Sequence, residues 1–404
     1  MQSRPGVRAI VWHLASAIVL ATTGCASATA ARRQSVSPLV RDTIWYVSVR
    51  ARDAAGRDQR ALADSIEYGA AIFERPWVAD PISDPLAFHL RDSVRFSRTE
   101  FLSALTQRLV MQSTADDYAV FYVHGFGTGL DECWRHPADA STRAGTTVPW
   151  VAFCWPSHGR GIAWPRVGAL LVRAYEDDTA SVSAAAPAFT QTLADLTNAL
   201  GHTRVLVTAH SLGGRMVAEA LARADTSYRT ARNTATDSAT APLRGIAWLA
   251  LDHDAARFAD TLLPALHARA SRLVLYTARR DRALTISRRM HDTPRAGLAD
   301  PDPLVRPGLE TVDASDAFAT DGLFQRLFGN RHAVRRAAGL LWDLTHVVGR
   351  PLPPTCRDSL DLGARDSVGV WHLGAAPPKE PLAGGPCAPS PTVSRDSVWT
   401  EWRA

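Results

Sequence analysis

Apolar strand segments that alternate with helical segments are the feature that most constrains the fold of this chain. The segments YAVFYV, VPWVAFC, TRVLVTAH, GIAWLAL and RLVLYTA are almost continuously apolar, and stretches with helical spacing separate most of them. A strand that is apolar on both faces is buried on both faces, which is typical of a parallel sheet covered by helices. The pattern predicts an α/β fold with a mostly parallel sheet, whose ligand chemistry lies at the carboxyl ends of the strands.

Three further segments predict individual elements around this sheet. TIWYVSVR is rich in aromatic and β-branched residues and predicts a strand at 43–50. FSRTEFLSALTQRLV has helical spacing, and Ser97 with Glu100 three residues later forms a capping-box pattern at its start. A long helix-compatible segment covers 167–200.

The two ends of the chain differ in composition from its centre. Two arginines precede an apolar run at 9–20, and small residues follow it, so we expect a signal peptide at 1–25 and a tether at 26–40. The α/β domain is then expected at 41–350. Residues 351–404 are rich in Pro, Gly and Ser, and we expect them to form a C-terminal extension.

Cys25 follows Gly24 in a lipobox-like setting, which favours a lipid-anchored protein in the periplasm or outer membrane of a bacterium. Cleavage by an ordinary signal peptidase after ASA or ATA is the alternative, and both predict export. An oxidising compartment allows disulfides among Cys133, Cys154, Cys356 and Cys387. Sequence order favours pairing the first two and the last two, and four buried thiols are the alternative.

Charge argues against one class of partner. The 404 residues carry a formal net charge of +5, but the arginines are interspersed with aspartates along the chain. Phosphate binding needs clustered positive charge, so we expect no nucleic-acid partner. No spacing of Cys and His suggests a metal, and no cofactor motif is complete, so we expect neither a metal nor a cofactor. The oligomeric state leaves no signal in the sequence.

Ser211 lies between an apolar strand and a helical segment in TRVLVTAHSLGGRMVAEAL. A strand that reverses into a helix within a few residues strains the backbone at the serine, so small neighbours are needed. Ala209, Gly213 and Gly214 meet this need, although the usual pattern has glycine where Ala209 stands. We expect Ser211 to be a nucleophile, with a capping serine in an ordinary turn as the alternative.

The chain offers an acid, a base and an oxyanion hole in the order usual for this arrangement. Asp281 follows the strand RLVLYTA, and His332 lies 51 positions later. The HGFG stretch follows another strand, so we expect the backbone N–H groups of Phe126 and Leu212 to face one oxyanion. The alternatives left open for the acid and for the base are Asp252, Asp254, His346 and His291.

The segments VHGFGTG, FCWPSHG, TAHSLGG, LYTARRDRAL and GNRHAV together resemble bacterial alpha/beta hydrolases of a family of unknown function. The resemblance covers about 43–348, and it includes the alanine before the serine. It implies that Ser211 is the nucleophile, Asp281 the acid and His332 the base. It also implies that the substrate pocket is lined by residues of these motifs, which are His124, Gly125, Trp155, Ser157 and His210.

These observations predict an exported serine hydrolase that cleaves small-molecule or lipid esters through an acyl-enzyme. Two alternatives stay open on the sequence. One is a non-catalytic module of the same fold that binds or scaffolds at the cell envelope. The other is a lipase or peptidase that uses the same three residues.

Overall fold

The structure is a computed structural model, and it describes residues 39–77, 87–112, 117–157, 168–223, 242–317, 332, 337–374 and 387. The chain divides into two units, Met1–Leu39 and Val40–Ala404, and only Leu39 of the first unit is described. The expected signal peptide, the lipobox with Cys25 and most of the expected tether therefore lie outside the described residues.

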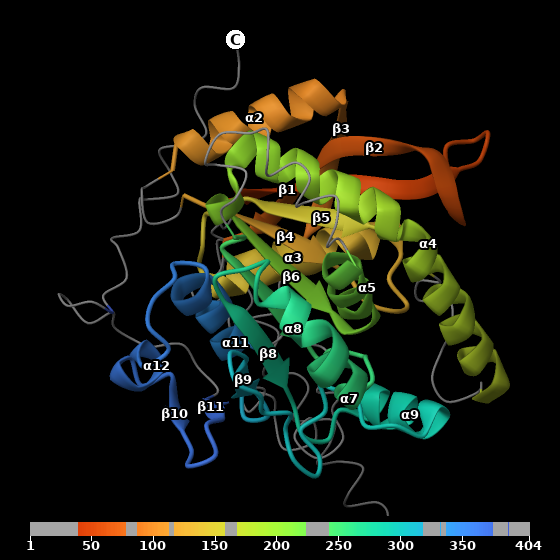
Figure 1. The fold of residues 1–404 in the computed structure, drawn as a ribbon. Coiled ribbons are helices and arrows are strands. Elements are labelled where there is room, and N and C mark those ends of the chain that lie inside the picture. The colour runs from red at the N-terminus through yellow and green to blue at the C-terminus, as the bar shows by residue number, and fades with distance from the viewer. Residues whose placement is uncertain are drawn as a thin grey trace, which may run out of the picture. The chain divides into compact units, whose positions relative to one another are not determined.

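The described strands form one sheet in the order β10-β11-β9-β8-β7-β6-β4-β5-β1-β2-β3 (Figure 1). Their bounds are β1 (Leu39–Arg52), β2 (Asp58–Pro76), β3 (His89–Phe96), β4 (Ala119–Val123), β5 (Trp150–Cys154), β6 (Val205–His210), β7 (Gly245–Leu249), β8 (Leu273–Thr277), β9 (Glu310–Asp313), β10 (Gly363–Arg365) and β11 (Trp371–Leu373). All neighbours from β11 to β1 pair in parallel, whereas β2 with β3 and β10 with β11 are antiparallel. The predicted fold class is confirmed.

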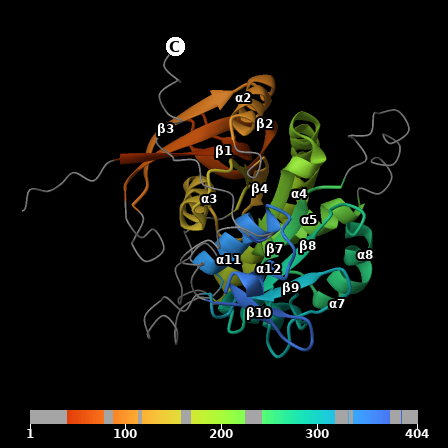
Figure 2. The same cartoon turned by 90° about the vertical axis from the view of Figure 1, so that its left-hand side faces the viewer.

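Helices cover both faces of this sheet, as Figure 2 shows. Their bounds are α2 (Arg98–Val110), α3 (Leu130–Ala144), α4 (Gly168–Leu200), η3 (His202–Arg204), α5 (Ser211–Arg223), α7 (Ala255–Arg257), η5 (Phe258–Leu262), α8 (Leu263–Leu266), α9 (Arg282–His291), α11 (Ala338–Trp342), η7 (Asp343–Val348) and α12 (Cys356–Ser359). Phe121 and Val123 of β4 pack with α2, α4, α5 and α8, whereas Val120 and Tyr122 pack with α3, α11 and α12. Alternate side chains of a buried strand thus pack into two separate hydrophobic cores, one on each face of the sheet.

Local sequence signals account for the elements that the sequence predicts. Ser97 caps α2, and the capping box with Glu100 is complete. The long helix expected at 167–200 is α4, and the strand expected at 43–50 forms the centre of the longer β1. β1 starts at Leu39 and so includes the last two residues of the expected tether.

The structure places no domain boundary at residue 350. β11 pairs in parallel with β9 and so continues the central sheet, and β10 then pairs with β11. Arg357 of this segment is fully buried and bonded to Asp343. Residues 351–374 therefore pack as part of the sheet-containing unit, and of the remainder of the extension expected at 351–404 only Cys387 is described.

Two disulfides tie loops to this framework. Cys133 of α3 pairs with Cys154 at the end of β5, and Cys356 of α12 pairs with Cys387. This is the pairing that sequence order favours. Each bond closes a short loop, since the paired residues are 21 and 31 positions apart.

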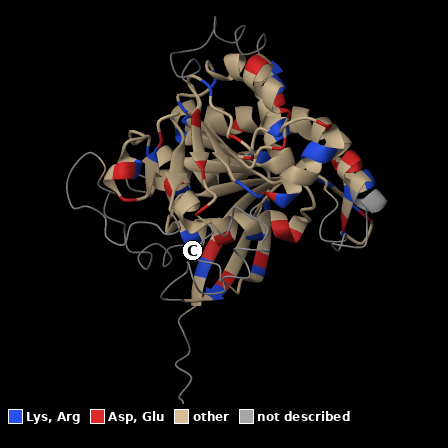
Figure 3. Cartoon of the chain, turned by 90° about the horizontal axis from the view of Figure 1, so that it is seen from below, with Lys and Arg blue, Asp and Glu red and all other residues tan. Residues whose placement is uncertain are grey.

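The described residues show no large region of one charge sign (Figure 3), no membrane-spanning helix and no metal-binding cluster. Positive and negative residues are intermingled along the elements seen in Figure 3. No helix among the described residues is long and apolar enough to cross a membrane. In the same part of the chain, no group of three or more His, Cys, Asp or Glu side chains could hold a metal ion.

Candidate active site

Ser211 stands at a strained junction between β6 and α5. It is buried, and its φ is +51°, a left-handed value that residues with a side chain rarely adopt. Gly213 allows this turn, because a Cβ there would lie 2.1 Å from the backbone oxygen of His124. A strained serine between a strand and a helix, with a glycine two positions later, is the geometry of a nucleophile elbow.

Asp281 and His332 lie together at the same edge of the sheet. Asp281 follows β8 and caps α9, its Oδ1 accepting a hydrogen bond from the Leu284 amide at 3.0 Å. Its Oδ2 lies 2.8 Å from Nδ1 of His332, and the carboxylate is fully buried. A carboxylate at Nδ1 holds a proton there, so Nε2 carries the lone pair that can accept a proton from a serine.

The same pair raises the pKa of His332 above its usual 6.5. Burial lowers this pKa, because a desolvated imidazolium is unfavourable. The charge of Asp281 and its hydrogen bond, together with the charge of Asp252, act in the opposite direction and prevail. His332 is therefore a stronger base than a solvated histidine.

A pH profile tests this pair. Hydrolysis by His332 as base needs its neutral form, so activity rises as the pH rises through the raised pKa. We expect the acid limb of kcat/KM to be half-maximal above pH 6.5. Asp281→Asn removes the charge, so the limb should move to lower pH while kcat falls about 10⁴-fold. Asp254→Asn is the control and should leave the limb in place; a wild-type limb below pH 6.5 would contradict the assignment.

The two rival acids are engaged elsewhere. Asp252, after β7, forms a buried ion pair with Arg295 at 2.8 Å and accepts hydrogen bonds from Tyr175 and Ser287. Asp254 caps α7 through the amide of Arg257. Among these carboxylates, the structure brings only Asp281 into hydrogen-bond contact with His332.

The two rival bases lie apart from the acid. His346 belongs to η7 and stacks on Trp342, and burial lowers its pKa to about 3. The neighbouring Thr345 accepts a hydrogen bond from Tyr118, which precedes β4. This places η7 at the amino ends of the parallel strands, opposite to Ser211. His291 is exposed at the end of α9, against the ring of Tyr175.

The loop between β4 and α3, residues 124–129, passes directly beside Ser211. A Cβ on Gly125 would lie 3.0 Å from the Cβ of Ser211, so a side chain at this position would crowd the serine. Side chains accept hydrogen bonds from the amides of Gly127 and Thr128, and no described side chain accepts from that of Phe126. Leu212 contributes an amide from the first turn of α5, where no intrahelical acceptor exists. The two predicted oxyanion donors thus belong to segments that meet at Ser211.

Three residues expected to line the pocket make contacts that support this loop. His124 and Trp155 are fully buried and stacked at 4.8 Å, and the indole donates to the backbone oxygen of His124. Burial lowers the pKa of His124 to about 3, so it is neutral. The hydroxyl of Ser157 accepts from the Thr128 amide at 3.2 Å and is also bonded to Asp178. These contacts support the loop, and the expected role of the three residues in lining a substrate pocket stays a prediction.

His210 connects the loop and the base. Its Nε2 lies 2.9 Å from the backbone oxygen of His332, and the two rings are 4.6 Å apart. Its Nδ1 lies beside Gly125. His210 is partly exposed, so of the expected pocket residues it is the one that retains access to solvent.

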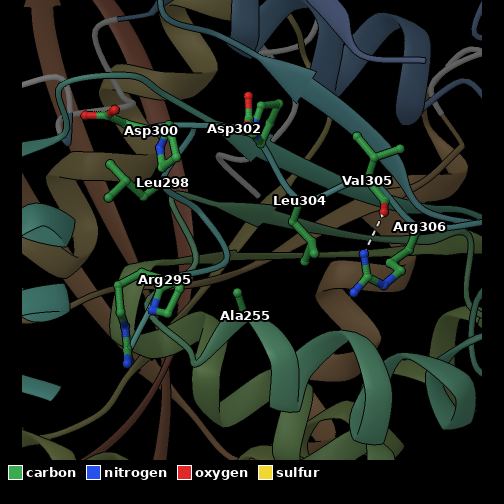
Figure 4. Close-up of a pocket in the computed structure, with 11 residues that line it drawn as sticks. Ala255, Arg295, Leu298, Asp300, Asp302, Leu304, Val305 and Arg306 are labelled. Carbon is green, nitrogen blue, oxygen red and sulfur yellow. Dashed lines mark hydrogen bonds between the residues drawn. The ribbon is translucent and has the colours of Figure 1, made fainter. Parts of the chain in front are cut away.

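A pocket of about 330 Å³ lies away from all of these residues. It is lined by Ala255 and by the segment 294–306 that follows α9, including Arg295 and Leu304 (Figure 4). None of the predicted site residues contributes to its lining.

Sequence reasoning missed two buried charged residues next to the loop. Arg50, near the end of β1, donates to the backbone oxygens of Thr128 in the loop and Trp155 after β5, and Asp178 of α4 accepts from Gly127. A single arginine at the end of the otherwise apolar strand TIWYVSVR is the signal that could have revealed the first. Asp178 lies in a helix with other acidic residues and gives no comparable signal.

Two of the solved structures that the chain matches are described as hydrolases, and both matches have low sequence identity and low TM-scores. A predicted CIB-like hydrolase from Thermoplasma acidophilum is 12% identical and has a TM-score of 0.26, with 75% of this chain and 98% of that chain covered. Carboxyl esterase 2 from Tuber melanosporum is 13% identical and has a TM-score of 0.25, with 81% and 97% covered. No curated protein matches the chain.

One family profile matches the chain. It spans residues 97–338, more than half of the 404 residues, and thus includes Ser211, Asp281 and His332. The described part of this range contains the parallel strands β4 to β9 and the helices on both of their faces. The chain belongs to the family described as alpha/beta hydrolase of unknown function (DUF900).

Proposed function

We propose that this protein is a serine hydrolase that cleaves carboxylic esters. Nε2 of His332 takes the hydroxyl proton of Ser211 while Oγ attacks the ester carbonyl carbon. The amides of Phe126 and Leu212 stabilise the oxyanion, and its collapse expels the alcohol, which receives the proton from His332. Water, activated by the same histidine, then attacks the acyl-enzyme and releases the acid.

One observation carries this proposal. Asp281 is bonded to Nδ1 of His332 at 2.8 Å at the edge of the sheet where Ser211 adopts a strained φ of +51°. A strained backbone costs about 1–3 kcal/mol and persists where the surrounding structure enforces it, commonly at functional sites. An Asp–His pair at the same sheet edge as such a serine supports nucleophilic catalysis better than a structural turn, which needs neither the strain nor the pair.

A fluorophosphonate probe tests the proposal. The probe reacts with activated serines, so wild-type protein should be labelled and Ser211→Ala should not be. Ser287→Ala is a matched control that should be labelled as the wild type is, because Ser287 is buried like Ser211 but lies on α9, where its hydroxyl donates to Asp252. Labelling of wild type and Ser211→Ala to the same extent would refute Ser211 as nucleophile. A folded wild type without labelling or ester turnover would favour a binding module.

We further propose that the protein is exported and carries a lipid on Cys25. Two disulfides support export, because such bonds persist in oxidising compartments. In a bacterial host fed with an alkyne-tagged fatty acid, the wild type should incorporate the tag and Cys25→Ser should not. Equal incorporation, or recovery of the untagged wild type in the soluble exported fraction, would contradict a lipid anchor.

A further inference from the structure

The β4–α3 loop, residues 124–129, is held by contacts from three other parts of the chain. Besides its own strand and helix, the end of β1, the end of β5 and helix α4 all bond to it. The predicted oxyanion donor Phe126 lies in its centre. What fixes the loop therefore also fixes this donor relative to Ser211.

Arg50 is the centre of these contacts. Its NH1 donates to the backbone oxygens of Trp155 at 2.9 Å and Thr128 at 3.4 Å, and its NH2 donates to that of Ser157 at 3.2 Å. Its Nε bonds to both carboxylate oxygens of Asp58, which balances the charge of this buried guanidinium. The planar fork can bind several acceptors at once, which a lysine cannot do.

Asp178 holds the loop from the other side. Its carboxylate accepts a hydrogen bond from the Gly127 amide at 3.3 Å and one from the Ser157 hydroxyl, which itself accepts from the Thr128 amide at 3.2 Å. Asp178 and Ser157 are both almost fully buried. The two amides after Phe126 are thereby bonded to Asp178 and Ser157.

A covalent bond joins the same two segments. The disulfide between Cys133 and Cys154 connects the first turn of α3, which follows the loop, to the last residue of β5, which precedes Trp155. The loop is thus fastened at its carboxyl end by a disulfide and along its length by charged hydrogen bonds.

We propose that Arg50, together with Asp178, is a positioning residue that fixes the β4–α3 loop so that the Phe126 amide faces the oxyanion formed at Ser211. The catalytic half of this inference rests on the proposed function. The anchoring half, that Arg50 and Asp178 hold the loop in place, does not depend on the proposed function. Burial of a charged group costs free energy even when the group is hydrogen-bonded. Apart from its bonds to Asp58, the buried guanidinium of Arg50 donates to the loop and to the segment after β5, not to other described parts of the core.

Hydrogen exchange of the peptide covering 124–129, measured by mass spectrometry, tests the anchoring without any substrate. Arg50→Met should speed exchange of this peptide about tenfold or more. Arg75→Met is the matched control, since the Arg75 side chain is as buried as that of Arg50 and pairs with Asp42 at 2.8 Å at the opposite end of β1. Ser157→Ala serves as a milder second variant if Arg50→Met does not fold.

Kinetics on p-nitrophenyl butyrate test the catalytic half. Arg50→Met should lower kcat about 100-fold with KM within about twofold, because a misplaced oxyanion donor weakens the transition state and not substrate binding. Arg50→Lys should recover only part of the loss, and Arg75→Met should keep wild-type kcat.

The outcomes separate the two halves. Unchanged exchange at 124–129 in both Arg50→Met and Ser157→Ala overturns the anchoring. Faster exchange with an unchanged kcat overturns the catalytic role. Faster exchange in a protein whose wild type neither hydrolyses esters nor reacts with the fluorophosphonate probe refutes the proposed function and supports the anchoring.

Discussion

Replacement of Ser211 by alanine should lower kcat for a short-chain ester about 10⁶-fold, with the residual rate supplied by substrate binding and the oxyanion hole. Alanine keeps the Cβ of serine, so the strained φ of +51° is neither relieved nor worsened. The variant should therefore fold as the wild type does, and the loss should reflect the missing Oγ alone.

A double variant sharpens this expectation. Nucleophile and base act as one unit, so His332→Ala alone should cost about as much as Ser211→Ala, and the two together should cost no more. The measurement is kcat and KM on p-nitrophenyl butyrate for the three variants, with circular dichroism to verify folding. A loss under tenfold for Ser211→Ala, or losses that multiply in the double variant, would contradict a shared mechanism.

Replacement of Arg357 by methionine should lower the free energy of unfolding by about 3–5 kcal/mol. The guanidinium is fully buried and bonds to both oxygens of Asp343 at 2.8 and 3.0 Å and to Glu310 at 2.9 Å. Tyr276 also donates to Asp343 at 2.6 Å. Without Arg357, the buried carboxylate of Asp343 loses its main counter-charge, and an uncompensated charge in the interior is strongly unfavourable.

Urea unfolding at pH 7 with the disulfides intact measures this effect. The variant Arg357→Met with Asp343→Leu is the matched control, and it should recover much of the lost stability because it removes both charges. Activity per folded molecule should be unchanged, since this cluster lies apart from Ser211. A loss below about 1 kcal/mol in the single variant would show that the ion pair does not hold the C-terminal segment in place.

The central strands and the candidate triad could be predicted from the sequence because their signals are local. A run such as VLVTAH is apolar throughout, so β6 is identifiable without knowledge of its neighbours. Ser211 follows β6, and Asp281 follows β8. The carboxyl ends of parallel strands lie at one edge of the sheet, so residues that follow such strands come together there. Ala209 fits the same logic, since the turn needs a small residue rather than glycine itself.

Features that depend on distant partners could not be predicted. β10 and β11 have three residues each, too few for any periodicity, and they form because β9 offers a sheet edge beside the buried Arg357. The segment DQRALADSIEYGAAIFERP forms β2, although its first half is polar, because β3 pairs with its second half. Trp155 and Ser157 suggest a pocket by their chemistry, and only the contacts of His124 and Asp178 reveal their supporting role.

Trapping of the acyl-enzyme tests the central claim most directly. Wild-type protein is mixed with p-nitrophenyl butyrate, quenched in acid within the first turnovers and digested, and its peptides are weighed by mass spectrometry. We predict a butyryl adduct on the peptide that contains Ser211, and no adduct on that peptide in Ser211→Ala. Turnover of the ester with no adduct at Ser211, or with the adduct on another residue, would contradict the account.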